Sequence, residues 1–573
     1  MLEFSLRPES KFHSLSIPQA AADAAIASTD QSGIVVFPCG GGKTALFLRA
    51  ACRGCLKVLV LEYESQGVLQ TADVILQETD VGKDFLCVYT SEKKTEPNFL
   101  ACFMVATYSM FAGTEHKQSK LTRRVSDFVF NKTTWDLVVC DECQHAPADT
   151  FRDVVERLRA CSKRILGFTG TLCRSQLGAH VEEHVRRGEL SYQEATELHF
   201  GFLGPVLFRR SCADLEATGD IAKLNLCRIE TPPISHEAYF CRAHALTEGV
   251  TRLYLAAMHP AKLEVLWRIL HMHHYRGDQG MIFVDHLLHA SILKDMLGTR
   301  WAVLAGAEME DMARSTSATS NRELVKRFNA GELDGIIASP VGESSLDAYS
   351  SLFRFIVVFD AHGGAATASQ RLGRGARTPR VPRNEGEDDA ALIARQRAEQ
   401  KIAFYYELVS PLTEEVTAAE KRREQFEAEG YAIPEMRHDA FMQNTAAVGE
   451  QHRAFPYASE DEQIRLLHRV LTHQDRQAAE SAGRKAARTV RDGHRDKVNS
   501  AKKRATQCPS PLFRERYWKQ AKHLQKDRAS VQLAASEERS KAILAHEAPE
   551  EARKVFDQLG IAPERLAALG LVY

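Results

Sequence analysis

A glycine-rich loop between a predicted strand and a predicted helix is the feature that most constrains the fold of this chain. The loop reads Phe37-Pro-Cys-Gly-Gly-Gly-Lys-Thr44; it follows the apolar run Gly33–Phe37 and opens a helical pattern at Thr44. Glycines carry no Cβ, so their N–H groups can turn toward an anion, and a helix N-terminus adds partial positive charge. The sequence therefore predicts a phosphate-binding turn.

The residue types in this loop indicate a nucleotide rather than a simple anion. A lysine at this position reaches β- and γ-phosphates, and the hydroxyl that follows it holds Mg²⁺. We therefore predict ATP and Mg²⁺ as cofactors. The predicted binding residues are Gly40, Gly41, Gly42, Lys43 and Thr44. Phe37 stands where such loops usually have their first glycine.

A second motif, Trp135-Asp-Leu-Val-Val-Cys-Asp-Glu-Cys-Gln144, ends an apolar strand in two carboxylates. Nucleotides bind at the carboxyl edge of parallel sheets. We expect Asp141 to hold Mg²⁺ through water, and Glu142 to orient and deprotonate an attacking water. Strand ends of this kind are common in isolation, but this one follows a phosphate loop, which favours the catalytic interpretation.

A third motif, Gln370-Arg-Leu-Gly-Arg-Gly-Ala-Arg377, places Arg374 and Arg377 on one helical face. Guanidinium groups supplied from a facing domain would neutralise charge on a transferred γ-phosphoryl group. The alternative is a basic helix that binds anions without specificity.

Two series of short apolar runs alternate with helical patterns between about residues 12 and 435. Runs with little polar alternation are typical of parallel strands that are buried on both faces. We therefore predict an α/β fold with two tandem doubly wound domains. The runs are Gly33–Phe37, Val58–Leu61, Phe103–Ala106, Trp135–Cys140 and Ile165–Phe168, then Gly280–Val284, Gly335–Ala338 and Phe355–Phe359.

The composition changes after about residue 438. Residues 484–528 hold 15 Lys and Arg against 4 Asp and Glu, a net charge of +11, whereas the whole chain carries −1. We expect a mostly helical, basic C-terminal extension. It is either a solvated or protein-binding face or a nucleic-acid contact; Tyr517-Trp518 among cations leans toward nucleic acid.

The predicted domains follow from these patterns. Residues 1–200 and 260–437 form the two α/β lobes, 201–259 a connector with a small helical projection, and 438–573 the extension. Apolar runs are too short to span a membrane, and no signal peptide is visible. The 13 cysteines are scattered, and we assign the Cys52/Cys55 and Cys140/Cys143 pairs to buried thiols rather than structural zinc.

These motifs, together with Thr169-Gly-Thr171, resemble superfamily-two helicases and translocases, and most closely the XPB helicase family. Further matching stretches run in order over residues 12–435. They are Leu15–Gln19, Ala106–Met110, Ala146–Ala148, Phe151–Val155, Leu166–Arg174, Gly204–Phe208, Gly219–Lys223, Val341–Asp347, His362–Gly364 and Phe404–Val409.

The resemblance implies two RecA-like lobes with ATP between them. It implies that Gln19 contacts adenine and that Asp347 and Gln370 line the inter-lobe nucleotide site. It further implies that Thr169 and Thr171 couple hydrolysis to DNA movement, and that the stretch 235–254 is the family's thumb-like insertion. The expected activity is ATP-dependent DNA translocation or unwinding, with 3′ to 5′ polarity.

Several positions depart from the family pattern. Gln144 replaces a histidine, with His145 one place later, and we expect its amide to bridge the γ-phosphate and the second lobe. Arg174-Ser175-Gln176 replaces an Arg-Glu-Asp element implicated in strand opening, and Gly170 replaces an alanine. The phosphate loop begins only about 38 residues into the sequence, so we expect the family's large N-terminal region to be missing. We therefore expect a shortened, divergent paralogue whose tail resembles nothing recognised.

The expected partners are DNA and proteins of a transcription or repair complex, in the nucleus of a eukaryote or otherwise the cytoplasm. Two other functions stay open. One is a catalytically weak paralogue that serves as a nucleotide-gated interaction module, and the other is an RNA-dependent ATPase.

Overall fold

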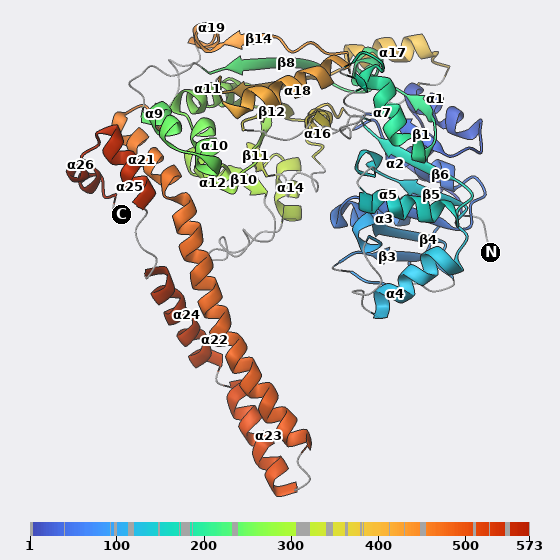
Figure 1. Ribbon diagram of the computed structural model, residues 1–573. Coiled ribbons are helices and arrows are strands. Elements are labelled where there is room, and N and C mark those ends of the chain that lie inside the picture. The colour runs from blue at the N-terminus through green and yellow to red at the C-terminus, as the bar shows by residue number, and fades with distance from the viewer. Residues whose placement is uncertain are drawn as a thin grey trace. The chain divides into compact units, whose positions relative to one another are not determined.

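The computed structural model describes residues 4–571 except 39, 92, 97–99, 113–119, 147–148, 171, 173–183, 186, 232–238, 305–320, 340–347, 361–364, 379–380, 382, 385, 412, 429, 447–453, 508–510, 527 and 545–549. The chain forms two compact units, and each is discontinuous in sequence (Figure 1). The first contains Met1–Pro232 and Val265–His452, and the second contains Pro233–Glu264 and Arg453–Tyr573.

The first unit contains two parallel seven-stranded sheets. Every strand pair in both is parallel, and the non-consecutive strand order of each sheet requires crossover connections. The order in the first is β3-β4-β2-β5-β6-β1-β7, with β1 Gly33–Val36, β2 Val58–Glu62, β3 Leu86–Tyr89, β4 Phe103–Thr107, β5 Leu137–Cys140, β6 Ile165–Thr169 and β7 Val206–Arg209. The order in the second is β10-β11-β9-β12-β13-β8-β14, with β8 Lys223–Glu230, β9 Gln279–Phe283, β10 Trp301–Leu304, β11 Gly335–Ala338, β12 Phe353–Val358, β13 Ile402–Val409 and β14 Glu435–Arg437.

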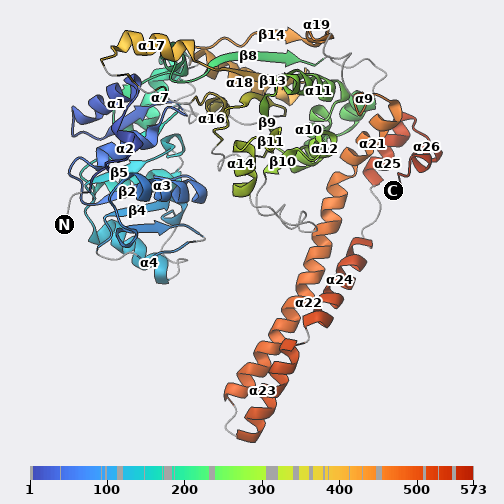
Figure 2. The ribbon, with the colours of Figure 1, turned by 180° about the vertical axis from the view of Figure 1, so that it is seen from behind.

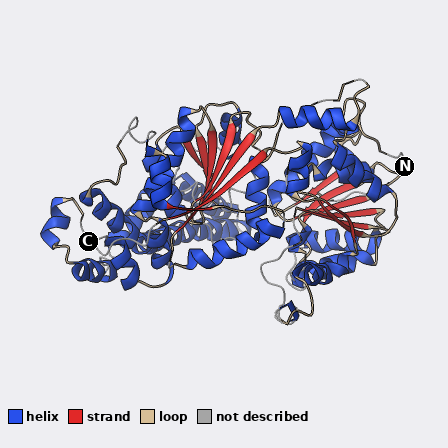
Figure 3. Ribbon diagram, turned by 90° about the horizontal axis from the view of Figure 1, so that it is seen from above, coloured by secondary structure: helices blue, strands red, loops and turns tan. Residues whose placement is uncertain are grey.

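Helices cover both faces of each sheet (Figure 3). The central strands are buried on both sides, as in β1 and β2 where every residue is buried, so their sequences are continuous apolar runs. Around the first sheet lie α1 Ile17–Ala27, α2 Lys43–Ala51, α3 Ser65–Glu78, α4 Lys120–Asp127, α5 Asp149–Arg159 and α7 Tyr192–Phe200. Around the second lie α8 Cys212–Thr218, α11 Pro260–Tyr275, α12 Leu287–Leu297, α14 Asn321–Asn329, α16 Ala365–Gly375, α17 Asp389–Ala398, α18 Glu414–Ala428 and α19 His438–Asn444.

The α/β fold class with two doubly wound parallel sheets is confirmed. All eight apolar runs form strands. The sequence analysis did not identify β3, β7, β8, β10, β13 or β14. Two of these lie in the segment read as a connector: β7 pairs with β1 in the first sheet, and β8 pairs with β13 in the second. The lobe boundaries at residues 200 and 437 stay predictions.

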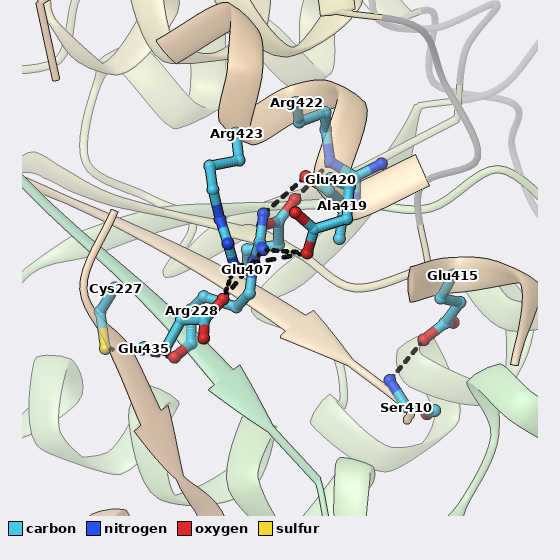
Figure 4. Close-up of polar contacts among 10 residues, drawn as sticks. All are labelled: Cys227, Arg228, Glu407, Ser410, Glu415, Ala419, Glu420, Arg422, Arg423 and Glu435. Atoms are coloured by element: carbon cyan, nitrogen blue, oxygen red, sulfur yellow. Dashed lines mark hydrogen bonds and ion pairs between the residues drawn. The ribbon is translucent and has the colours of Figure 1, made fainter. Parts of the chain in front are cut away.

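A buried ionic cluster fixes β8 in the second sheet (Figure 4). Arg228 of β8 is 1% exposed; its Nε donates to Glu407 Oε2 of β13 at 2.6 Å, and its Nη2 donates to the Ala419 carbonyl of α18 at 2.6 Å. Arg422 of α18 donates to the other Glu407 oxygen. Glu435 of β14 accepts from Arg228 Nη1 at 3.2 Å. Opposite charges thus link three strands and a helix within the core.

The second unit is helical and has two parts. Its base consists of α9 Tyr239–Leu246 and α10 Gly249–Ala257, which pack with α21 Glu460–Leu471 and α25 Glu550–Leu559. Arg242 Nη2 of α9 donates to the Gln558 carbonyl of α25 at 3.0 Å. Arg565 of α26 Pro563–Ala568 pairs with Glu460 and Asp461 of α21, each at 3.1 Å. The predicted helical projection is therefore packed on the C-terminal extension.

The other part of this unit is a long helical arm (Figure 1, Figure 2). It consists of α22 His473–Gln507, against which α23 Pro511–Lys526 and α24 Arg528–Leu544 pack one after the other, with α23 at the far end of the arm. The expectation of a mostly helical extension describes this region correctly. None of the helices that the structure describes is both long and apolar enough to cross a membrane.

Candidate active site

The phosphate-loop sequence forms the predicted strand–loop–helix turn. Gly40 and Gly42 adopt positive φ angles of 83° and 93°, which residues with a Cβ rarely adopt. Gly42 is the residue that caps α2, so Lys43 and Thr44 are the first two residues of that helix. The amide groups of a helix N-terminus therefore lie where the sequence predicts phosphate binding.

Phe37 explains why the loop needs glycine at position 41. The Phe37 ring is fully buried, and its backbone N–H donates to the Thr169 carbonyl of β6 at 2.8 Å. A Cβ on Gly41 would lie only 2.5 Å from this ring, so a larger residue would displace one or the other. The phenylalanine at the loop's first position is thus accommodated because its ring packs against Gly41 within the loop.

Gln19 lies against the same loop. It is 1% exposed at the first turn of α1; its Nε2 donates to the Gly41 carbonyl at 2.5 Å, and its Oε1 accepts from the Ser16 N–H at 3.1 Å. The structure therefore brings Gln19 to the loop, and its contact with adenine stays a prediction.

The two carboxylates follow β5 at the carboxyl edge of the sheet. The Asp141 N–H donates to the Leu61 carbonyl of β2 at 2.9 Å. Glu142 has φ 46° and ψ 48°, and it is the one non-glycine residue with positive φ in the described part of the chain. That conformation costs a side-chain-bearing residue about 1–2 kcal/mol, and such strain is typical of functional sites.

A chain of hydrogen bonds connects the loop to the ends of β5 and β6. Lys43 is only 8% exposed, and its Nζ donates to Glu142 Oε1 at 3.3 Å. Gln144 Nε2 donates to Glu142 Oε2 at 2.8 Å, and Gln144 Oε1 accepts from Thr169 Oγ1 at 2.6 Å. Gln144 and Thr169 are both buried. Four residues that the sequence assigned to binding, catalysis and coupling therefore form one polar chain.

Gln144 bridges Glu142 and Thr169, whereas its predicted bridge between the γ-phosphate and the second lobe stays a prediction. The His145 ring stacks on Tyr63 with centroids 3.9 Å apart, on the aromatic group that includes Phe151. An amide can donate to one neighbour and accept from another, as Gln144 does between Glu142 and Thr169.

Burial and the neighbouring charges at this edge shift the pKa values of Asp141 and Glu142 in opposite directions. Burial and the neighbouring Glu142 raise the pKa of Asp141 to about 6. Burial also acts to raise the pKa of Glu142, but the Lys43 ammonium and the Gln144 hydrogen bond outweigh it and lower that pKa. Glu142 is thus held as the anion, as a group that orients water requires.

Glu62 is a third carboxyl group here, and the sequence analysis missed it. It ends β2, is 5% exposed, and its Oε1 accepts from Thr71 Oγ1 at 2.6 Å. Burial and the Asp141 charge raise its pKa well above the usual range, so the neutral form is favoured. Its signal was a charged residue at the end of the apolar run Val58–Leu61.

The arginine motif begins in α16, within the same unit as the phosphate loop, but α16 ends at Gly375 and Arg377 lies beyond it, in an isolated bridge with Ile221. The expectation that Arg374 and Arg377 share one helical face is therefore wrong. A Cβ on Gly40 would lie 3.0 Å from the Gly373 carbonyl and 3.2 Å from Arg377 Cγ. Arg371, which the sequence did not single out, is 1% exposed; it donates to Asp285 Oδ1 at 3.3 Å and lies over the Phe283 ring. Arg371 therefore fixes α16 on the second sheet, while Arg377 lies beside the loop.

Several predicted residues cannot be placed. Thr171, Ser175, Gln176 and Asp347 lie outside the described residues, and of Gln370 only the backbone, within α16, is described. Arg374 lies on the last turn of α16 and is partly buried.

The family model for the ERCC3/RAD25/XPB C-terminal helicase matches residues 215–502, half of the chain. The chain belongs to this family. A model for the type III restriction enzyme res subunit matches residues 7–174, over the first sheet. The XPB-type match reaches Lys502, well into the extension. The expectation that nothing after residue 438 resembles a known family is therefore wrong for residues 438–502.

Named relatives agree with this assignment. The chain is 28% identical over 450 residues to the "General transcription and DNA repair factor IIH helicase/translocase subunit XPB" of Schizosaccharomyces pombe, covering 78% of this chain and 49% of the relative. It is 28% identical over 465 residues to the XPB/SSL2 subunit of Saccharomyces cerevisiae, covering 81% and 48%. The chain thus spans about half the length of these curated relatives. The solved structure "S. cerevisiae Dbp5 bound to RNA and ADP BeF3" is similar with a TM-score of 0.47 and 15% identity, covering 77% of this chain and 94% of that one.

One variant pair tests the polar chain of this XPB-type site. Thr169→Val keeps the shape but removes the hydroxyl that Gln144 accepts from, so we expect the ATP turnover that the site predicts to fall about tenfold, the equivalent of about 1.4 kcal/mol. Thr169→Ser keeps the hydroxyl and should retain most of the activity. Steady-state kcat with and without DNA is the measurement. Equal losses in both variants would mean that loss of the hydroxyl does not by itself explain the effect, and would contradict this prediction.

Proposed function

We propose that this protein is an ATP-dependent DNA translocase or helicase of the XPB type, with a role in transcription initiation, nucleotide excision repair or both. The observation that carries the proposal is the polar chain from Lys43 through Glu142 and Gln144 to Thr169, at the carboxyl edge of a parallel sheet. Family membership supports it, because the same edge would hold the nucleotide in a helicase.

The residues present fit ATP and Mg²⁺. Left-handed glycines and the start of α2 supply amide donors for phosphates, and Lys43 supplies a cation. Thr44 and Asp141 would hold the magnesium ion, which withdraws charge from the phosphates when bound. Glu142 would orient the attacking water and accept its proton. Arg374 and Arg377 would neutralise charge on the transferred group, and Thr169 would pass the change at the nucleotide to the DNA-binding face.

Two other functions are weighed against this one. A catalytically weak, nucleotide-gated interaction module would not need Glu142 to be held as an anion in a strained backbone. An RNA-dependent ATPase would use the same lobes, and no described residue separates the two. We propose nuclear localisation if the organism is eukaryotic, cytoplasmic localisation otherwise, and protein partners within a transcription or repair complex.

The deciding experiment measures the ATPase rate in parallel without nucleic acid and with single-stranded DNA, duplex DNA or RNA. Stimulation by DNA over RNA is expected. No hydrolysis under any condition would favour the interaction module, and stimulation by RNA alone would favour the RNA-dependent enzyme.

A second experiment separates translocation from strand separation. Ser175 and Gln176 replace two acids that the family places near the opening fork, so we expect DNA-stimulated ATPase with poor unwinding of blunt or short-tailed duplexes. Displacement of a third strand should persist, because translocation needs only the lobes. The double variant Ser175→Glu, Gln176→Asp should raise unwinding. Robust unwinding by the unchanged protein alone would contradict this prediction.

A further inference from the structure

The arm of the second unit is a narrow, straight helical hairpin. Its longest helix, α22, has 35 residues, which corresponds to about 52 Å at 1.5 Å per residue. Its buried row consists of small side chains, among them Ala487, Ala501 and Ala505 on α22 and Ala521 on α23. His494 Nε2 lies 2.9 Å from the Leu524 carbonyl and fixes the register of α22 against α23. The thin core leaves most of the α22 surface to polar side chains.

Four cations form one row on a flank of α22, which we call the basic row. Arg488, Arg491, Arg495 and Lys502 are separated by three, four and seven residues. At 3.6 residues per turn this spacing keeps them on one side, roughly a quarter turn from the buried row. The row is about 21 Å long at 1.5 Å per residue, which equals the axial rise of about six base pairs of a duplex.

The side chains of this row are accessible. Those of Arg488 and Arg495 are 83% and 69% exposed. Asp492 lies between them and forms an ion pair with each, at 3.5 Å and 3.1 Å. Exposed ion pairs of this kind contribute little to stability, so a phosphate can replace the carboxylate. Arg491 is exposed, and Lys502 is partly exposed.

We propose that the basic row of α22 binds the phosphate backbone of double-stranded DNA. This inference deepens the proposed function by assigning it a DNA contact outside the ATPase lobes, and only the choice of DNA rests on that function. A straight helix such as α22, with its cations in a line, can lie against the phosphates of a stiff duplex. Single strands are usually held by successive aromatic faces, and among the described side chains of the arm only Trp518 is a largely exposed aromatic, at 41%.

The charge distribution favours duplex DNA over an acidic protein surface as the ligand of the basic row. Residues 484–528 carry +11 while the rest of the chain carries −12, so the positive field is confined to the arm region. Counterions released from a duplex make such binding strongly salt-dependent, whereas one acidic protein patch offers far fewer charges.

The test keeps the arm in place, because removing residues 453–573 would also uncover the α9 and α10 side chains that pack on α21 and α25. Four cations of the basic row are replaced in Arg488→Gln, Arg491→Gln, Arg495→Gln, Lys502→Gln. The matched control removes the same charge from the other sides of α22, as Lys485→Gln, Lys497→Gln, Lys503→Gln, Arg504→Gln. All four control side chains are exposed.

Binding of a fluorescent 30-base-pair duplex to the full-length protein is followed by anisotropy at several salt concentrations, without nucleotide. We expect the row variant to bind about ten- to a hundredfold more weakly at low salt and its slope of log affinity against log salt to flatten by about 3 to 4, at about 0.9 per contact. The control should change the slope by less than one. Equal changes in both variants, or none in the row variant, would overturn the proposal.

A single substitution provides a second test that does not depend on removing charges. Asp492→Asn frees Arg488 and Arg495 and should tighten duplex binding severalfold and steepen the salt slope; unchanged or weaker binding would count against the basic row. Thermal melting of each variant reports folding. Because DNA binding is read without ATP, a protein that hydrolyses no ATP but shows the slope difference would refute the proposed function and leave this inference standing.

Discussion

Replacing Lys43 with alanine is expected to lower the ATP hydrolysis rate at least about a hundredfold, the equivalent of about 3 kcal/mol of transition-state stabilisation. The ammonium is buried at the start of α2 and would act on the β- and γ-phosphates, where charge develops. It also donates to Glu142 at 3.3 Å and helps to keep that carboxyl ionised. Its loss therefore removes a phosphate contact and weakens the group that orients water.

A matched variant separates these two effects. Glu142→Gln keeps the lysine, so ATP binding should persist while hydrolysis fails. Nucleotide affinity, measured by fluorescent-ATP titration, should fall in Lys43→Ala and be retained in Glu142→Gln. Full ATPase activity in Lys43→Ala would refute both the site and the proposed function.

Replacing Glu407 with alanine is expected to destabilise the second sheet by about 3–5 kcal/mol, because it leaves two buried cations without their counter-charge. Glu407 is fully buried and accepts from Arg228 and Arg422. Arg228 would keep its bonds to the Ala419 carbonyl and Glu435, which do not neutralise both guanidinium groups. Urea unfolding followed by tryptophan fluorescence measures the loss, since Trp301 lies in β10 of this sheet.

Two controls define the cause. Glu420→Gln changes a carboxylate that lies 3.5 Å from Arg228 Nη1 but whose side chain is 49% exposed, and it should cost less than about 1 kcal/mol. The triple variant Arg228→Met, Glu407→Leu, Arg422→Met removes all three buried charges and should lose less stability than Glu407→Ala alone. A triple variant that is less stable than the single one would assign the loss to packing instead of unpaired charge.

The sequence predicted correctly those features whose structure depends on a single short segment of the chain. Consecutive glycines before Lys43 predict a turn that uses positive φ angles. The runs Val58–Leu61 and Ile165–Phe168 have no polar face, so they predict strands that are buried on both sides. Strands at or near the sheet edges were harder to identify. β8 alternates buried and exposed residues and contains Arg228, because one of its two neighbours, β14, is only three residues long.

The sequence by itself determined the phosphate loop, the two carboxylates after β5, the family and the positive charge of the extension, because each depends on residues close together in the chain. Only the tertiary structure decided that Gln144, and not His145, joins Glu142 to Thr169, and that Glu62 is a third buried carboxyl group. It alone showed that α9 and α10 pack with α21 and α25, more than 200 residues later. Such contacts depend on which apolar faces meet after the chain has folded, and no local pattern in either segment specifies the other.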